Sequence, residues 1–172
     1  MASLMENLIV TLGDLCEEYE NLLGLSTQKK PVIIAGNLEE LSKITDEEQI
    51  VVSRINQLDR KRQEVVRDIA NVVNRDVEDL KLDSIIQMLE PRPSEQQKLA
   101  AVYDRLKDVV GRVKQINEQN RQLIINALEL IEFDINMVQA MRAAPETANY
   151  NKGAYNTGSV IGVDRSGFDA KQ

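Results

Sequence analysis

Apolar residues recur every three or four positions along the first 144 residues, which is the spacing of one face of an α-helix. The first apolar stripe predicts a helix of about two dozen residues. It runs through Leu4, Leu8, Leu12, Leu15, Tyr19 and Leu22. Gly24 and the Ser26-Thr27 pair weaken the end of this helix, and residues 31–36, which begin with Pro31, predict a separate short connector helix.

A second helix is predicted to begin at Asn37. Asn37 is the expected N-cap, with Glu40 as its capping-box partner three residues on, and acidic residues in the first turn suit the positive end of the helix dipole. The apolar stripe that follows is interrupted only by Glu48 and Arg62. Two interpretations stay open: these residues fix the register between helices, or their side chains extend out of the stripe into solvent.

A third, much longer helix follows a turn region at residues 74–90, which contains a short helix at 82–89. Ser94 is the expected N-cap of the long helix, with Gln97 as its capping-box partner. Apolar residues at heptad spacing continue over about 47 residues, a rod of roughly 70 Å. Two amides, Asn117 and Asn120, interrupt this stripe. A buried Asn requires hydrogen-bond partners, so we expect these two to fix the pairing register across the helices, and the alternative is a direct role in binding.

These patterns predict an all-α protein: an elongated antiparallel three-helix bundle, coiled-coil-like in its packing, with a short connector helix and a flexible carboxyl-terminal tail. The bundle domain is expected at 1–144. The tail is expected at 145–172, where Gly, Asn, Ser and Thr replace the apolar stripes. Helices of unequal length leave part of the longest one uncovered, and exposed Leu, Ile, Val and Met side chains there indicate a partner site or an oligomer contact.

Composition excludes several kinds of catalytic site. The sequence contains no His, and therefore no Ser-His triad, no Cys-His pair and no His-containing zinc site. Cys16 is the single cysteine, so no disulfide can form within the chain, which suits a reducing compartment. Adjacent carboxylates such as Glu17-Glu18 are better explained as solvated helix surface than as a catalytic or metal-binding pair. We expect no enzymatic activity, no metal site and no cofactor.

The charge balance disfavours nucleic acid as a partner. Lys and Arg number 21 and Asp and Glu number 28, which gives a net charge of −7. The basic stretch Arg60-Lys61-Arg62 has carboxylates on both sides and is better explained as a solvated helix face. No apolar run approaches the ~20 residues that span a membrane, and the first residues lack the basic start of a secretion signal. We expect a cytoplasmic protein without membrane insertion.

A series of short motifs stands out by its order and spacing along the chain. The first helix carries Tyr19-x-x-Leu22-Leu23, and the second begins with Gly36-Asn37-x-x-x-Leu41. The third carries Ile116-Asn117-x-x-Asn120-x-x-Leu123-Ile124, and the tail carries Tyr150-Asn-Lys-Gly153 and Tyr155-Asn-Thr-Gly158. In this order the motifs resemble those of the FlgN family of flagellar type III export chaperones, and the resemblance extends over most of the chain.

The resemblance implies a small cytoplasmic protein without enzymatic activity that binds the hook-associated proteins of the hook–filament junction. Such a chaperone prevents premature assembly of these clients and delivers them to the cytoplasmic domain of the flagellar export gate. In the family the carboxyl-terminal part binds the client. By resemblance, the client-binding residues here are Leu123, Ile124, Leu128, Ile131, Ile135, Val138 and Met141.

A tail tyrosine of the family contributes to docking at the export gate. The resemblance assigns this role to Tyr150 or Tyr155, and the repeated Tyr-Asn-x-Gly sequence leaves both open. The alternative function is a structural coiled-coil protein that associates with itself and has no secreted client. A homo-oligomer therefore remains among the expected states.

Overall fold

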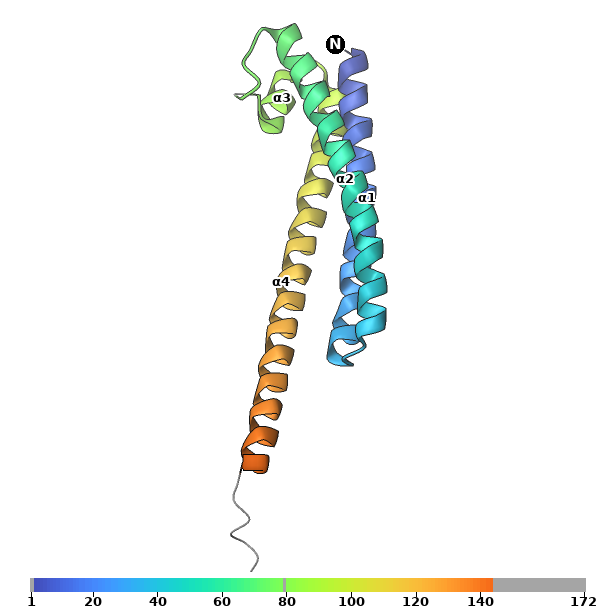
Figure 1. Ribbon diagram of the computed structural model, residues 1–172. Helices are drawn as coiled ribbons and strands as arrows, with labels where there is room; N and C mark the ends of the chain where they lie inside the picture. Colours follow the sequence, from blue (N-terminus) through green and yellow to red (C-terminus); the bar gives the residue numbers. More distant parts are fainter. Residues whose placement is uncertain (1, 79, 144–172) are drawn as a thin grey trace, which may run out of the picture. The chain divides into compact units, whose positions relative to one another are not determined.

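The computed structural model describes residues 2–78 and 80–143, and all regular secondary structure in these ranges is helical. The helices are α1 (Ala2–Ile34), α2 (Leu38–Val73), α3 (Leu82–Met88) and α4 (Pro93–Ala143) (Figure 1). The all-α class predicted from the apolar spacing is confirmed. The chain divides into two units, Met1–Glu132 and Phe133–Gln172, and each is considered by itself. Residues 133–143 are the described part of the second unit, and they are helical.

Helix α1 continues without interruption to Ile34, so the predicted end after about two dozen residues and the separate connector helix at 31–36 are both wrong. Pro31 lies inside the last turn of α1. The physical reason is tertiary packing around Ser26, which is fully buried and donates a 2.8 Å hydrogen bond from Oγ to Glu48 Oε1 on α2. This packing outweighs the low helix propensity of Gly24 and Ser26.

The turn between α1 and α2 is set by Gly36, whose φ of 65° places it in the left-handed region that favours glycine. Its backbone N–H donates to Ile33 O at 3.1 Å, and the N–H of Asn37 donates to Val32 O at 3.2 Å, which together form a Schellman motif. Asn37 Oδ1 then accepts from the backbone N–H of Glu40 at 3.1 Å. The N-cap predicted at Asn37 is confirmed, and the chain reverses within three residues.

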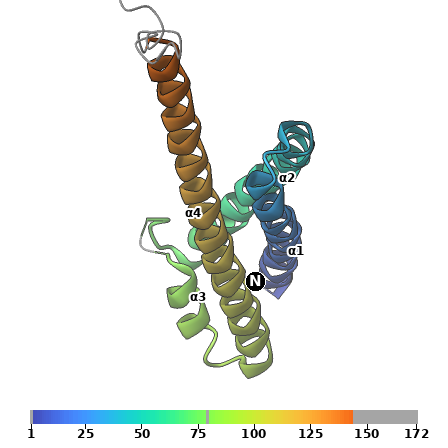
Figure 2. The ribbon, with the colours of Figure 1, turned by 90° about the horizontal axis from the view of Figure 1, so that it is seen from below.

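Helices α1 and α2 pack against each other, and Figures 1 and 2 show them side by side. Their cross-helix partners run in opposite order along the chain. Glu18 Oε1 lies 3.6 Å from Arg54 Nη1, whereas Ser26 pairs with the earlier residue Glu48. The two helices therefore run in opposite directions and form a hairpin.

Helix α4 contacts α1 through polar groups whose order is the same in both helices. The Cys16 thiol donates to Val102 O at 3.6 Å, Arg105 Nη2 lies 2.8 Å from Glu20 Oε2, and Asn120 Nδ2 donates to Ser26 O at 2.6 Å. Residue numbers rise together on both sides, so this part of α4 runs in the same direction as α1.

The buried core of the first unit is almost wholly aliphatic, in line with the 3% of aromatic residues in the sequence. Its members come from all four helices and the segment before α3, and they include Met5, Leu8, Leu12, Ile69, Leu80, Ile85, Leu89 and Leu99. Helix α3 confirms the short helix predicted near 82–89, and its Ile85 is completely buried in this core. Each such side chain contributes about 1.5–3 kcal/mol by leaving water.

Helix α4 begins at Pro93, two residues before the start that an N-cap at Ser94 implies, so the assignment of Ser94 as N-cap is wrong. Proline is favoured at the first helical position because its fixed φ suits the helix and its missing N–H is not needed there. The carbonyl of Arg92 accepts the first helical bond, from Gln96 N at 3.0 Å. The Gln96 side chain donates to Ile86 O at 3.0 Å and so joins the start of α4 to α3.

Candidate partner-binding surface

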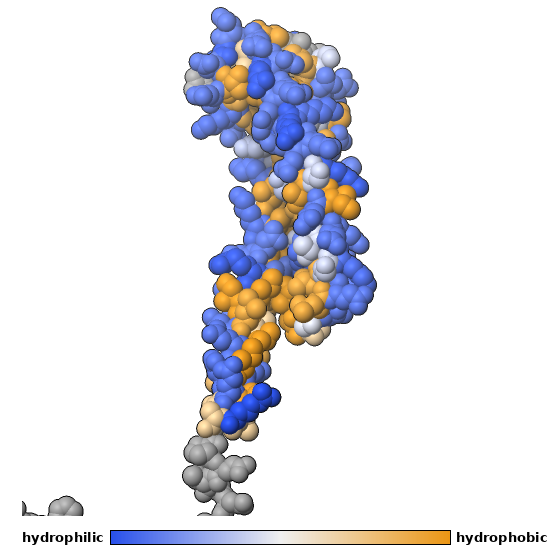
Figure 3. Space-filling view, viewed as in Figure 1, coloured by the Kyte–Doolittle hydropathy of each residue, from blue (hydrophilic) through white to orange (hydrophobic). Residues whose placement is uncertain are grey.

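The end of the α1–α2 hairpin and the facing stretch of α4 enclose an open apolar cavity of about 190 Å³, here called the hairpin groove. One wall consists of Val32, Ile33, Gly36, Asn37, Leu38 and Leu41, and the other of Ile124, Ala127, Leu128 and Ile131. All of these residues belong to the first unit. Figure 3 shows hydrophobic surface gathered over this end of the hairpin and over α4 beside it.

A buried polar network lies one to two helical turns from the hairpin groove. Asn120, which is 5% exposed, donates from Nδ2 to Ser26 O at 2.6 Å, and the Ser26 hydroxyl donates to Glu48. The second carboxylate oxygen of Glu48 pairs with Lys29 Nζ. This network ties α1, α2 and α4 together at one level, between the aliphatic core and the apolar groove.

The two polar interruptions of the α2 stripe behave differently. Glu48 contacts α1 through both carboxylate oxygens, whereas Arg62 Nε pairs with Asp59 Oδ1 of its own helix at 2.7 Å, and the Arg62 side chain is only 27% exposed. The α2 sequence alone does not tell which polar residue contacts another helix. Glu48 does so because Ser26 and Lys29 of α1 lie opposite it. No signal in the α1 pattern pointed to Ser26 as a buried partner.

The two amides predicted to fix register lie in different surroundings. Asn120 is buried against α1, and its Oδ1 has no hydrogen-bond partner among the described residues. Asn117 is exposed. The register-fixing role stays a prediction for both residues, and only Asn120 is placed at a helix–helix contact.

The predicted client-binding residues lie on α4, and most of them are exposed. Leu123 is half-buried and Ile124 is 39% exposed, whereas Leu128 and Ile131 of the first unit are 60% and 53% exposed. In the second unit Ile135, Val138 and Met141 are all exposed. The structure brings Ile124, Leu128 and Ile131 together with the end of the hairpin, whose contribution the sequence did not reveal.

Further apolar residues of α4 are equally open to solvent but were not among the predicted site residues. They are Leu130 in the first unit, and Phe133 and Met137 in the second. With 3.6 residues per turn, Leu130 and Met137 lie about 100° around the helix from Ile131 and Val138, and Phe133 lies on the face nearly opposite Ile135. The signal that would have found them is the width of the apolar arc, since a helix with apolar residues over more than half its circumference is normally covered from more than one side.

Tyr150 and Tyr155, the candidate residues for docking at an export gate, lie outside the described residues. The predicted flexible tail at 145–172 lies outside them as well. Both assignments stay predictions.

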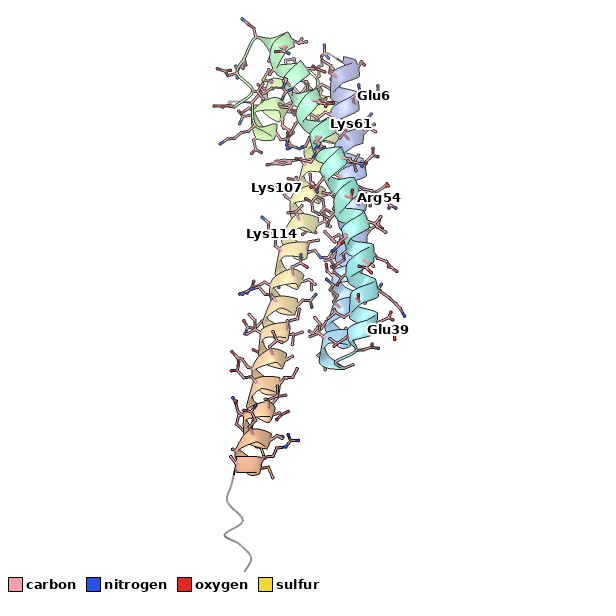
Figure 4. The ribbon with its side chains drawn as sticks, viewed as in Figure 1. Glu6, Glu39, Arg54, Lys61, Lys107 and Lys114 are labelled. Carbon is pink, nitrogen blue, oxygen red and sulfur yellow. The ribbon has the colours of Figure 1, made fainter. Side chains whose placement is uncertain are left out.

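Charged groups cover the outer faces of the helices and form pairs there. Lys107 and Lys114 project from α4 on the side away from α1 and α2 (Figure 4). Where Arg121 donates to Glu118 at 2.7 Å, the hydrogen bond lowers the pKa of the Glu118 carboxyl. Among the described residues, burial raises the pKa of the Cys16 thiol, an effect that the positive charge of Arg105 opposes. A protonated, buried thiol is a packing group and a poor nucleophile.

Larger hollows elsewhere on the first unit include two that are lined by charged residues of both signs. One, of about 490 Å³, is lined by Arg62, Arg67, Lys81, Asp83 and Tyr103, among others, and mixes both charge signs. The other, of about 480 Å³, lies between the acidic residues Asp14 and Glu18 and the basic residues Arg54 and Lys61.

Across residues 2–78 and 80–143, His, Cys, Asp and Glu form no group of three or more that suits a metal ion. None of the helices described is both long and apolar enough to cross a membrane.

A family model described as FlgN protein matches residues 1–157, which is most of the chain. The chain belongs to the FlgN family. The predicted resemblance to this family of flagellar export chaperones is therefore confirmed. The matched region contains the hairpin groove and the exposed part of α4.

The same chain is similar to the uncharacterized protein YvyG of Bacillus subtilis (strain 168). The two are 31% identical over 144 residues, which cover 84% of this chain and 83% of YvyG. No solved structure matches the chain. The family assignment thus comes from the comparisons. The apolar surface on α4 and the hairpin indicates what kind of partner the protein binds.

Proposed function

We propose that this FlgN-family protein is a cytoplasmic chaperone that binds hook-associated proteins, prevents their premature assembly and delivers them to the cytoplasmic domain of the flagellar type III export gate. It acts by binding alone, without catalysis, metal or cofactor. In this proposal the three long helices form an antiparallel three-helix bundle in solution, which serves as the rigid support for the client-binding residues.

The observation that carries the proposal is the exposure of large aliphatic side chains on α4. Leu128, Ile131, Ile135, Val138 and Met141 all present a substantial part of their surface to solvent. Isolated exposed residues of this kind are ordinary, but a series of them at helical spacing marks a surface that another polypeptide covers. A client terminus that is unfolded when free can cover it by folding as an amphipathic helix.

The energetics suit reversible binding. Each of these side chains has about half of its surface left to bury, which contributes about 1 kcal/mol per residue. The five residues together contribute about 5 kcal/mol on the chaperone side, and the client's own apolar side chains add to this gain when they are buried. The ordering of the client segment costs about 1–2 kcal/mol per residue of backbone and offsets most of the gain, so the net binding free energy is modest. A chaperone that must release its client at the export gate requires such a modest surplus.

Co-purification with a co-expressed hook-associated protein tests the proposal. The double variant Ile135→Glu/Val138→Glu loses apolar contact at both positions and sets two carboxylates against the client. We expect its affinity, measured by calorimetric titration, to fall at least about 30-fold. The matched control is Ile50→Glu, since Ile50 on α2 is also a half-exposed isoleucine.

The proposal fails if the unmodified chain retains no hook-associated protein, or if the control weakens binding as much as the double variant does. Circular dichroism of both variants checks that the helices remain intact. Docking at the export gate is tested separately: Tyr150→Ala and Tyr155→Ala, singly and together, are expected to reduce secretion of the client while leaving client binding unchanged. Equal secretion by the double tyrosine variant contradicts the tail assignment.

A further inference from the structure

We propose that the hairpin groove binds a single amphipathic helical segment of another polypeptide, with aliphatic side chains on one face and Lys or Arg residues flanking them. This inference rests on the proposed function and deepens it, because it names the chemistry of the client segment. It also makes the α1–α2 turn, with Val32, Leu38 and Leu41, a wall of the client site.

The volume of the groove decides what kind of occupant fits. About 190 Å³ is smaller than the roughly 300–1,000 Å³ that small-molecule and cofactor sites occupy. It has room for a few aliphatic side chains inserted from outside. The lining contains no charged residue, and its one polar side chain, Asn37, is engaged as the N-cap of α2. An occupant therefore gains by burying apolar groups and finds no partner there for a polar head group.

The arrangement of the walls favours a helix over an extended segment. Leu38 and Leu41 are three residues apart on α2, and Ile124, Leu128 and Ile131 follow at intervals of four and three on α4. Both walls are thus helical ridges, and a third helix whose side chains repeat at the same intervals packs between them. The buried network of Asn120, Ser26 and Glu48 lies one to two turns away, where polar groups succeed the apolar lining.

The net negative charge at this end of the first unit favours an occupant with basic residues on either side of its apolar face. Residues 26–48 and 120–132 hold seven carboxylates and four basic side chains, so three of the chain's seven net negative charges lie here. Three of the four basic residues are already paired: Lys29 with Glu48, Lys43 with Glu39, and Arg121 with Glu118. Glu39 at the first turn of α2 points outward (Figure 4). The carboxylates therefore attract a basic segment by long-range electrostatics and make no direct contacts inside the groove.

The same field argues against two other occupants. A second copy of the chain carries the same net charge of −7 and is repelled. The residues after Ala143 carry three acidic and three basic side chains, so they offer no net attraction. A basic segment of a different polypeptide is the occupant that both the lining and the charge favour.

Fluorescence anisotropy with two synthetic peptides and the full chain tests the inference. Both peptides are 18-residue labelled helices with Leu at intervals of three and four; one has Lys at its flanks and the other Glu at the same positions. At low salt we expect the Lys peptide to bind at least 10-fold more tightly than the Glu peptide. The difference should shrink in 1 M salt, where the screening length falls to about 3 Å.

The variant Leu38→Ser locates the binding. Leu38 is 77% exposed, so its replacement leaves the fold intact, and Ile50→Ser, at a 56% exposed position on the same helix, is the matched control. We expect Leu38→Ser to weaken the Lys peptide about 10-fold and Ile50→Ser to leave it unchanged. Hydrogen exchange of the unmodified chain provides a second measurement: the Lys peptide should slow exchange within 32–41 and 124–131.

Several results overturn the inference. They are equal binding of the two peptides at low salt, equal effects of Leu38→Ser and Ile50→Ser, or protection confined to other segments. Tighter peptide binding after truncation at Ala143 would make the chain's own tail the occupant, and a concentration-dependent mass abolished by Leu38→Ser would make it a second copy.

The outcome is separable from that of the proposed function. If a hook-associated protein is retained and Leu38→Ser does not affect its affinity, the inference fails and the chaperone role stands. If the Lys peptide binds in the groove and no hook-associated protein is retained, the reverse holds.

Discussion

Replacing Asn120 by Leu tests whether the buried polar network is there for stability or for specificity. Asn120 is 5% exposed; its Nδ2 donates one hydrogen bond to Ser26 O, and its Oδ1 is buried without a partner among the described residues. Leu has the same number of side-chain heavy atoms with the same branching, so the substitution Asn120→Leu changes polarity with little change in shape. We expect it to stabilise the protein.

The magnitude follows from three effects at this position. Loss of the hydrogen bond to Ser26 O costs about 1 kcal/mol, while the Ser26 carbonyl keeps its place in the α1 hydrogen-bond ladder. Removing the unpartnered Oδ1 gains about 1–3 kcal/mol, and burying an apolar side chain gains further. Repacking around the new methyl groups takes back part of this gain. The expected net effect is an increase of about 1–2 kcal/mol in the free energy of unfolding.

Urea denaturation followed by circular dichroism measures this effect, with Asn117→Leu as the control. Asn117 lies three residues earlier on α4 and is exposed, so its substitution should change stability by less than about 0.5 kcal/mol. A loss of more than about 1 kcal/mol in Asn120→Leu would refute the reasoning, because it would mean that the Asn120 hydrogen bond outweighs the burial of its unpaired oxygen. If Asn120 fixes register, the stabilised variant should also show more than one set of amide resonances for α4.

Two further predictions concern the turn and the buried thiol. Gly36→Ala should destabilise the protein by about 1–2 kcal/mol in the same urea assay, because Gly36 has a φ of 65°, whereas Gly24→Ala, with open space at the added Cβ inside α1, should stabilise it by about 0.5–1 kcal/mol. Equal effects at the two glycines would contradict this. Burial raises the pKa of the Cys16 thiol, with Arg105 opposing, so stability from the neutral thiol is present below the pKa of an unfolded thiol, about 8.5, and is lost as the pH rises through the higher folded value. The stability difference between the unmodified chain and Cys16→Ala should therefore decrease above pH 8.5, and a difference independent of pH would show that the thiol is not shielded.

Local signals in the sequence were sufficient for several elements. Asn37 with Glu40 three residues later placed the start of α2 correctly, because an N-cap requires only its own turn of helix. Apolar spacing of three and four identified the long helices and the short α3, since an amphipathic stripe follows directly from 3.6 residues per turn. The motifs at Tyr19, Gly36 and Asn120 carried the family resemblance that the match over residues 1–157 confirms.

Elsewhere the local rules of helix propensity led to a wrong prediction because a distant residue decided the outcome. Gly24 and Ser26 have low helix propensity, and by local rules α1 should end near them. Glu48, 22 positions further along the chain, and Asn120, 94 positions further, bond to Ser26 and keep the helix intact. No local pattern records such partners.

The sequence by itself determined the helical class, the start of α2, the apolar stripes of the helices, the absence of histidine chemistry and the family. Only the tertiary structure decided which polar residues meet across helices and which apolar residues stay open to solvent. It buried Ser26 and Asn120, left Leu38 and Leu128 exposed, and set the α1–α2 turn opposite α4 to form the hairpin groove. The physical reason is that helix periodicity is a property of neighbours in the chain, whereas burial depends on which other helix lies opposite, and that contact joins residues far apart in sequence.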